Sequence, residues 1–158
     1  MPVDPDEFRL VLSRFASGVT VVTACDATGH PHGITVSAFC SVSLSPPLIL
    51  VSIEKAAGSH DAIKGSGSFV VNILRESQRE LSEHFALPIN GKFASVEHRT
   101  GTGGIPVLSG TLGALECRLR NDYDGGDHTI FVGEVEDSSV EDGEPLLYYR
   151  GGYHEIAV

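Results

Sequence analysis

Short runs of β-branched and apolar residues, each ended by turn-forming residues, limit the fold of this chain more than any other feature. Val19 to Ala24 is followed by the turn sequence Asp26-Ala27-Thr28-Gly29, which leads into a second run, His32 to Val36. Short apolar runs between turn residues predict strands. Two further runs, Leu48 to Ile53 and Phe69 to Leu74, are continuous enough to predict central strands covered on both faces. We therefore expect a sheet of several short strands.

The C-terminal part of the sequence continues this pattern. Leu112 to Arg120 and His128 to Val135 have the composition of strands, and Asp124-Gly125-Gly126-Asp127 between them predicts a hairpin turn. A last strand is expected around Leu146 to Arg150. Mostly antiparallel short strands with two or three helices indicate a β-barrel-like core of mainly β or α+β class. At this length we expect one domain, residues 1–158.

Two sequences predict the starts of helices. Asp4-Pro5-Asp6-Glu7 combines an N-cap acid, a proline at the first helical position and a glutamate that completes a capping box. Apolar residues follow at helical spacing: Phe8, Val11, Leu12 and Phe15. We expect this helix to pack one face on the core and Gly18 to close it. Ser77-Gln78-Arg79-Glu80 is a second capping box. The irregular stretch from Ala86 to Gly110 is long enough to predict a functional or interface loop.

Charge and cysteine usage exclude several classes of protein. The formal net charge of −10 and the scattered basic residues make a poor surface for nucleic-acid phosphates. The acidic start lacks the order of a signal peptide, and no apolar run approaches the roughly 20 residues of a membrane span. Cys25, Cys40 and Cys117 have no metal-binding or redox spacing and are expected to be small buried residues in a reducing compartment. We therefore expect a cytoplasmic protein with no nucleic-acid or membrane partner.

The motifs of several common catalytic sites are missing. The sequence has no G-x-G-x-x-G after a strand, no P-loop, no G-x-S-x-G and no H-E-x-x-H. His30 and His32 flank Pro31 at a turn, but the sequence suggests no further ligands, so no metal site is predicted. An organic cofactor is then the natural carrier of difficult chemistry.

Three local patterns suit a planar, anionic cofactor. From Thr35 to Leu48, hydroxyls alternate with small apolar residues, which suits a heteroatom-rich ring; a plain strand edge and turn is the alternative. Lys55 and Ser59, the latter as N-cap of a short helix from His60 to Lys64, would form an anion site; the alternative is a solvated loop lysine. Gly126-Asp127-His128 places an imidazole at a strand mouth, where it can position a ligand or be merely a polar strand end.

In this order the segments resemble the short-chain flavin reductase family, the reductase components of two-component flavin monooxygenases. The likeness runs from about Phe8 to Tyr153, nearly the whole chain. No single piece is diagnostic, and the resemblance depends on five pieces in sequence. They are Ser17 to Thr23, Gly33 to Leu48, Phe69 to Leu74, Gly126 to His128 and Pro145 to Tyr153.

The resemblance implies a split β-barrel that binds FMN or FAD at a homodimer interface and takes electrons from NADH or NADPH. The residues implied to line the flavin ring are Thr35, Val36, Ser37 and Ala38, with backbone from Ser52 and Ile53. Those implied to hold the phosphate are Lys55 and Ser59, with Asn72, Lys92 and Phe93 near the cofactor. Asp127 and His128 belong to the motif associated with the nicotinamide nucleotide, and Tyr148 and Arg150 would close the pocket. Relatives often carry a hydroxyl just after the phosphate-loop base, whereas this chain has Ala56-Ala57, which leaves the choice between FMN and FAD open.

The implied function is an NAD(P)H:flavin oxidoreductase that supplies reduced flavin to a partner monooxygenase, with His128 positioning the nicotinamide nucleotide. A pyridoxamine-phosphate oxidase-like enzyme would need several basic groups around a substrate phosphate, and the scattered arginines do not indicate such a cluster. A non-catalytic flavin- or haem-binding module would keep the first two patterns but need no nicotinamide site. Gly126-Asp127-His128 argues against that module.

Overall fold

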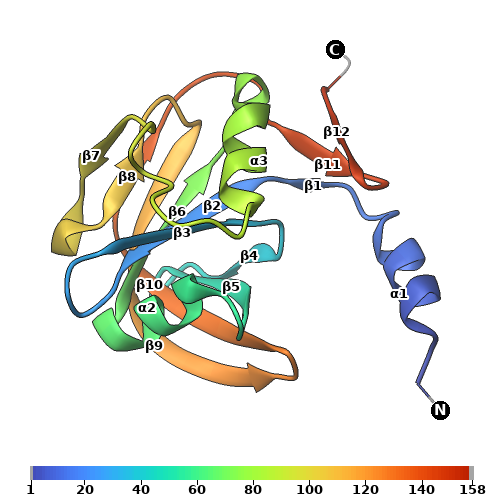
Figure 1. Ribbon diagram of the computed structural model, residues 1–158, viewed down its shortest axis with the longest axis horizontal. Coiled ribbons are helices and arrows are strands. Elements are labelled where there is room, and N and C mark those ends of the chain that lie inside the picture. The colour runs from blue at the N-terminus through green and yellow to red at the C-terminus, as the bar shows by residue number, and fades with distance from the viewer. Residues whose placement is uncertain (1, 157–158) are drawn as a thin grey trace.

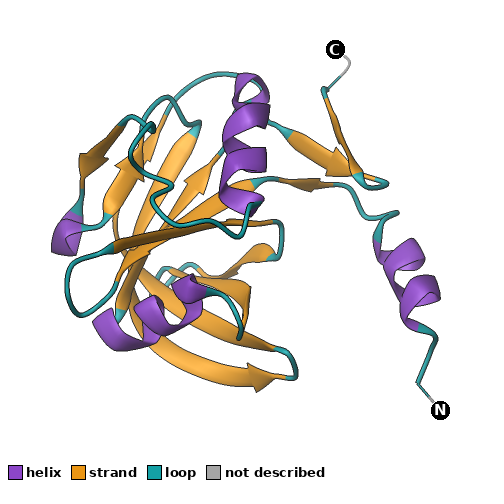
Figure 2. Cartoon of the chain, viewed as in Figure 1, coloured by secondary structure: helices purple, strands orange, loops and turns teal. Residues whose placement is uncertain are grey.

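The computed structural model describes residues 2–156, and strands are its main type of secondary structure (Figure 2). Seven of these strands form one antiparallel sheet in the order β3-β2-β6-β9-β10-β5-β4 (Figure 1). Their bounds are β2 Thr20–Cys25, β3 Pro31–Val36, β4 Phe39–Ser43, β5 Leu48–Glu54, β6 Ser68–Ile73, β9 Gly113–Gly125 and β10 His128–Val140. The predicted strands are thus present, and the mainly β class is confirmed.

The sheet closes into a barrel because its two outermost strands are consecutive in the chain. Only Ser37 and Ala38 connect β3 to β4, so the opposite edges of the sheet cannot lie far apart. At this seam the Ser52 backbone N–H donates to the Ala38 carbonyl at 3.0 Å. Two register shifts along β10, at Val132/Gly133 and Val135/Asp137, help the long β9–β10 hairpin to bend, since a bulge increases local twist.

Burial differs between the two strands that were expected to be covered on both faces. In β6 four consecutive residues, Phe69 to Asn72, are buried, which confirms the prediction there. In β5 the prediction is wrong, because burial alternates and only Ile49, Val51 and Ile53 are buried. β5 lies next to the edge strand β4, and its other face is only half-buried within one chain.

Two helices pack on the barrel. Helix α2 (Gly58–Ser66) buries Ala62 and Ile63 against the barrel interior, together with Val51 and Phe131. Helix α3 (Arg79–Ala86) follows a short 3₁₀ turn, η1 (Glu76–Gln78), and buries Phe85 in a second cluster.

The predicted capping box at the start of α3 is wrong in register. Helix α3 begins at Arg79 with no side-chain cap, two residues beyond the Ser77 that was expected to cap it. Instead the Gln78 Oε1 accepts a hydrogen bond from the Arg75 backbone N–H at 3.0 Å. The Gln78 side chain therefore caps the start of the 3₁₀ turn, and helix α3 follows directly after this turn.

Helix α1 (Pro5–Leu12) starts as predicted but does not pack as predicted. The Asp4 Oδ1 accepts from the Asp6 N–H at 2.9 Å, which confirms the N-cap. However, no residue of α1 is buried, and the helix projects away from the barrel (Figure 1). Phe15, on the face expected to meet the core, is 82% exposed. The periodicity correctly predicts a helix, but the helix ends at Leu12 and not at Gly18, and within residues 2–156 no other element buries its apolar face.

The remaining strands form two small sheets. The first is β1-β11-β12, with bounds Ser17–Gly18, Leu147–Tyr149 and Gly152–His154. The second, β7-β8, pairs His98–Thr100 with Pro106–Leu108 across the 3₁₀ turn η2 (Thr102–Gly104) and lies within the stretch expected to be irregular.

Two further findings concern the cysteines and membrane spans. Cys25 and Cys117 are buried as expected, but Cys40 is exposed, because it lies on the edge strand β4. Within residues 2–156, no helix is both long and apolar enough to cross a membrane.

Candidate functional site

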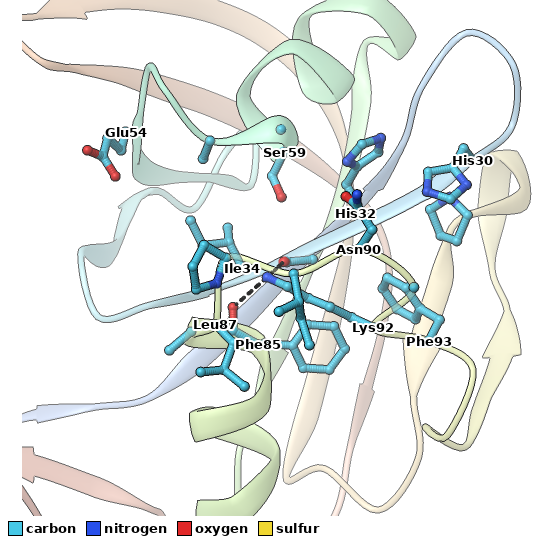
Figure 3. Close-up of a pocket in the computed structure, with 18 of the residues that line it drawn as sticks. His30, His32, Ile34, Glu54, Ser59, Phe85, Leu87, Asn90, Lys92 and Phe93 are labelled. Atoms are coloured by element: carbon cyan, nitrogen blue, oxygen red, sulfur yellow. Dashed lines mark hydrogen bonds between the residues drawn. The ribbon is translucent and has the colours of Figure 1, made fainter.

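A cleft of about 360 Å³ opens beside the start of α2. Three segments line most of it: His30 to Ile34 around β3, Ala56 to Ser59 at the helix start, and Phe85 to Phe93 at the end of α3 and beyond it (Figure 3). The last segment is part of the stretch predicted to be a functional or interface loop. The cleft therefore gathers residues that are far apart in the sequence.

The start of α2 provides hydrogen-bond donors to this cleft. Ser59 was expected to cap the helix, but Ala57 occupies the cap position and Ser59 lies inside the first turn, which corrects that prediction. Ser59 is 3% exposed, and its hydroxyl points into the cleft (Figure 3). A Cβ on Gly58 would lie 3.0 Å from the His32 Nδ1, so glycine allows the helix to begin against that ring. The unpaired N–H groups of a first helical turn favour an anion.

Lys92 and Phe93 lie in the cleft wall. The Lys92 Nζ donates to the Gly33 carbonyl at 3.0 Å and to the Phe85 carbonyl at 2.9 Å (Figure 3). Burial lowers the pKa of this ammonium. Phe93 packs edge-on against Phe85, with ring centroids 5.1 Å apart. Lys92 therefore ties the loop to β3 and α3.

The tip of the β9–β10 hairpin meets the chain just before α2. Gly126 has φ of +83° in the two-residue turn, a conformation that glycine adopts without strain. The Lys55 backbone N–H donates to the Asp127 carbonyl at 2.9 Å, and the Lys55 ammonium forms an ion pair with Asp124. His128 lies opposite Glu54 in the sheet register.

The charged side chains at the hairpin tip form pairs. The Asp127 Oδ1 lies 2.6 Å from the His128 Nδ1, and the hydrogen bond and charge of His128 hold the pKa of Asp127 below its ordinary value. The hydrogen bond and charge of Lys55 lower the pKa of Asp124 in the same way. With one nitrogen engaged by Asp127, the His128 ring has Nε2 left for a ligand.

The residues expected to line a ring lie at the barrel seam, next to the cleft. Ser37 and Ala38 are exposed, whereas Val36 and Ile53 are buried. The Thr35 hydroxyl is already engaged, because it donates to the Ser82 carbonyl at 2.6 Å. Ile34 and Glu54 line the cleft, so strands β3 and β5 contribute residues to both the seam and the cleft.

Three residues that were predicted to lie near the cofactor do not line the cleft. Asn72 is fully buried and bonds to the Val21 carbonyl at 2.9 Å and the Leu108 N–H at 2.9 Å, so direct contact with a cofactor is not available to it in this structure. Tyr148 lies in β11 and Arg150 in the turn between β11 and β12, and this small sheet is far from α2 (Figure 1). One chain therefore does not bring these two residues to the cleft.

Several residues of the site were not predicted. Asp124 pairs with Lys55 from 69 positions away. The His60 Nε2 lies 2.8 Å from the Thr129 Oγ1 in a buried contact between α2 and β10. The hairpin turn was the available signal for Asp124, but the pairing of β10 with β5 does not follow from local sequence.

The fold and these groups define a barrel protein suited to an anionic coenzyme, with the Ser59 hydroxyl in the cleft and the Lys55 and His128 side chains at the neighbouring hairpin tip. A model of the flavin reductase like domain matches residues 12–157. The reductase component of 4-nitrophenol 4-monooxygenase/4-nitrocatechol 2-monooxygenase from Rhodococcus opacus is 44% identical over 152 residues, 96% of this chain and 81% of that protein. A relative from Rhizobium meliloti is 41% identical over 150 residues, 95% of this chain, but the chain spans only 48% of its length.

Solved structures of similar fold come from the same kind of protein as these relatives. The NADH:FAD oxidoreductase SgcE6 of Streptomyces globisporus, solved in complex with NAD and FAD fragments, has a TM-score of 0.92 and 36% identity, covering 99% of this chain and 97% of that one. Component B of a nitrilotriacetate monooxygenase from Mycobacterium thermoresistibile has a TM-score of 0.91 and 38% identity, covering 96% and 86%.

The chain therefore belongs to the flavin reductase-like family. This confirms the resemblance, the split-barrel fold and the prediction of an oxidoreductase that uses flavin and a nicotinamide nucleotide.

Proposed function

We propose that this protein transfers a hydride from NADH or NADPH to FMN or FAD and supplies the reduced flavin to a separate monooxygenase. The observation that carries the proposal is the junction of Lys55 with the hairpin tip, which brings the start of α2 beside Asp127 and His128. The names of two relatives, a reductase component and an NADH:FAD oxidoreductase, support the same reaction.

The donor set fits a flavin with a phosphate tail. Ser59 and the first N–H groups of α2 would hold the phosphate, with Lys55, which precedes the helix and pairs with Asp124 outside the cleft lining, as the nearby cation. The ring would lie along the seam at Ser37 and Ala38, where small exposed residues allow close approach of the backbone. Bound flavin supplies the hydride-accepting chemistry, and the protein supplies alignment and electrostatics.

His128 is proposed to position the nicotinamide nucleotide. The Asp127 carboxylate fixes the imidazole through Nδ1, so the ring presents Nε2 at the mouth of β10. Hydride transfer requires no proton from this ring, and its contribution is therefore expected in binding and orientation. Backbone donors near Ala38 would stabilise the negative charge that develops on the cofactor.

A homodimer would explain the exposed apolar surface. Phe8, Val11 and Phe15 are all more than half exposed, and fully burying one such large side chain contributes about 1.5–3 kcal/mol. A second copy that covers α1 could also bring Tyr148 and Arg150 to the cleft, which one chain leaves distant from them. We further propose a cytoplasmic location, in which Cys25, Cys40 and Cys117 stay free thiols.

The test is oxidation of NADH and NADPH by the purified protein, followed with and without added FMN, FAD or riboflavin. The proposal predicts oxidation that depends on both protein and flavin, and reduced flavin that a monooxygenase in a separate dialysis compartment can use. A protein that binds flavin but does not accelerate nucleotide oxidation would instead be a flavin-binding module.

A further inference from the structure

The chain has three lysines, and two of them are paired with aspartates of the β9–β10 hairpin. The Lys55 ammonium forms an ion pair with Asp124, and the Lys64 Nζ lies 3.4 Å from the Asp122 Oδ2. Both lysines flank α2: Lys55 precedes the helix, and Lys64 lies in its last turn. The hairpin thus places one aspartate against the lysine before α2 and another against the lysine in its last turn. This is the helix that carries the proposed phosphate site.

The Lys55–Asp124 pair is held in place by the backbone. The Lys55 N–H bonds to the Asp127 carbonyl, which fixes the hairpin tip beside the lysine. The hydrogen bond of Lys55 and its charge, together with a backbone hydrogen bond from Gly126, keep the Asp124 carboxyl ionised well below neutral pH. Asp127, the other acid of the tip, is engaged by His128 instead. Lys55 therefore already has an oxyanion partner before any ligand binds.

We propose that Asp124 competes with the flavin phosphate for Lys55, so that it weakens flavin binding and favours flavin exchange. The inference rests on the proposed function, because it takes the phosphate to lie at the start of α2. Lys55 is 43% exposed, so its side chain can turn from one oxyanion to the other without disturbing the core. Phosphate entry would break the ion pair, and release of the flavin would restore it.

The test measures dissociation constants from flavin fluorescence for FMN and for riboflavin, which lacks the phosphate. Asp124→Asn should bind FMN about two- to fivefold more tightly than the wild type, the range expected for one exposed ion pair, and should leave riboflavin binding unchanged. Asp122→Asn is the matched control, because it changes the net charge equally but frees Lys64 instead of Lys55. It should leave FMN binding unchanged.

A second pair of variants tests the shared lysine. Lys55→Met should weaken FMN binding, and adding Asp124→Asn to Lys55→Met should have no further effect. If Asp124→Asn does not fold, as judged by circular dichroism, Asp124→Ser takes its place. Equal effects of Asp124→Asn and Asp122→Asn, equal effects on FMN and riboflavin, or no effect would each overturn the inference. A wild type that binds neither FMN nor riboflavin would overturn the proposed function as well, whereas flavin-dependent turnover with no Asp124 effect would overturn only the competition.

Discussion

The His60 imidazole and the Thr129 hydroxyl form a buried hydrogen bond, with 2.8 Å between Nε2 and Oγ1. His60 lies in the first turn of α2, beside Ser59, and Thr129 follows His128 in β10. The His60 ring also packs on Phe131, with centroids 5.3 Å apart. One contact thus fixes the proposed phosphate site relative to the proposed nicotinamide site.

Thr129→Val, which keeps the shape of the side chain but removes the hydroxyl, should therefore disturb both stability and binding. The free energy of unfolding should fall by about 1–3 kcal/mol, because the buried imidazole loses its partner. The KM values for flavin and NADH should rise more than kcat falls. Urea unfolding and steady-state kinetics measure these changes. Thr129→Ser retains the hydroxyl and should restore both KM values; if it behaves like Thr129→Val, the hydrogen bond is not the cause.

His128→Ala should raise the KM for NADH about tenfold, as expected for loss of one hydrogen bond, with a smaller fall in kcat. The reason is that the ring positions the nucleotide and does not transfer a proton. Steady-state kinetics at saturating flavin provide the measurement. His128→Gln, which keeps a side-chain donor, should recover part of the loss. Equal reductions in kcat and kcat/KM with unchanged KM would instead place His128 in the chemical step.

Glu116 should make the stability of the protein depend on pH. Its side chain is 3% exposed, and it accepts hydrogen bonds from the Arg99 guanidinium at 2.9 Å and the Thr102 N–H at 2.6 Å. Burial raises the pKa of Glu116, but these hydrogen bonds outweigh burial and hold the pKa below its ordinary value. A carboxyl with a lowered pKa stabilises the fold above its unfolded pKa, and this contribution is lost as the pH falls through the folded value.

Glu116→Gln should therefore lower the free energy of unfolding by about 1–3 kcal/mol at neutral pH. The difference from the wild type should shrink as the pH falls below about 4.3, the ordinary pKa of a glutamate. Denaturant titrations at several pH values and one protein concentration measure it. Glu136→Gln, at an exposed ion pair with Arg118, is the control and should change stability little. A difference that grows on acidification would contradict this account.

The exposed face of α1 should belong to a homodimer interface. Phe8→Ser should reduce the molar mass in sedimentation equilibrium toward that of one chain, because it removes a large apolar side chain from the proposed contact. Leu10→Ser alters an equally exposed residue on the opposite face of α1 and should leave the mass unchanged. A wild type that sediments as a monomer at micromolar concentration would refute the dimer.

Sequence reasoning succeeded where local patterns determine structure. The runs that became β2, β3 and β6 were found because β-branched residues and turns are local signals, and the Asp124–Asp127 turn predicted the hairpin. It failed where the outcome depends on how segments that are distant in the sequence pack together. The periodicity of α1 cannot reveal that its apolar face stays exposed within the described residues 2–156.

The candidate site likewise combines residues with a local sequence signal and residues placed by contacts between distant segments. Lys55 and Ser59 were proposed as site residues from local chemistry, but the cap position lies at Ala57 because α2 starts at Gly58 with no side-chain cap. Asp124 was missed because its contact with Lys55 depends on which strands are neighbours in the barrel. Asn72 was expected near the cofactor, and its complete burial follows from the packing of β6 beneath β8, which the sequence alone does not specify.

The central claim, direct hydride transfer from the nicotinamide to the flavin, is tested most directly by anaerobic single-turnover mixing. The protein with bound flavin is mixed with NADH or with NADH deuterated at the transferred position of C4, and loss of flavin absorbance is followed. The account predicts rapid bleaching that requires the protein and is severalfold slower with the deuterated nucleotide. Bleaching at the same rate without the protein, or no bleaching at all, would contradict it.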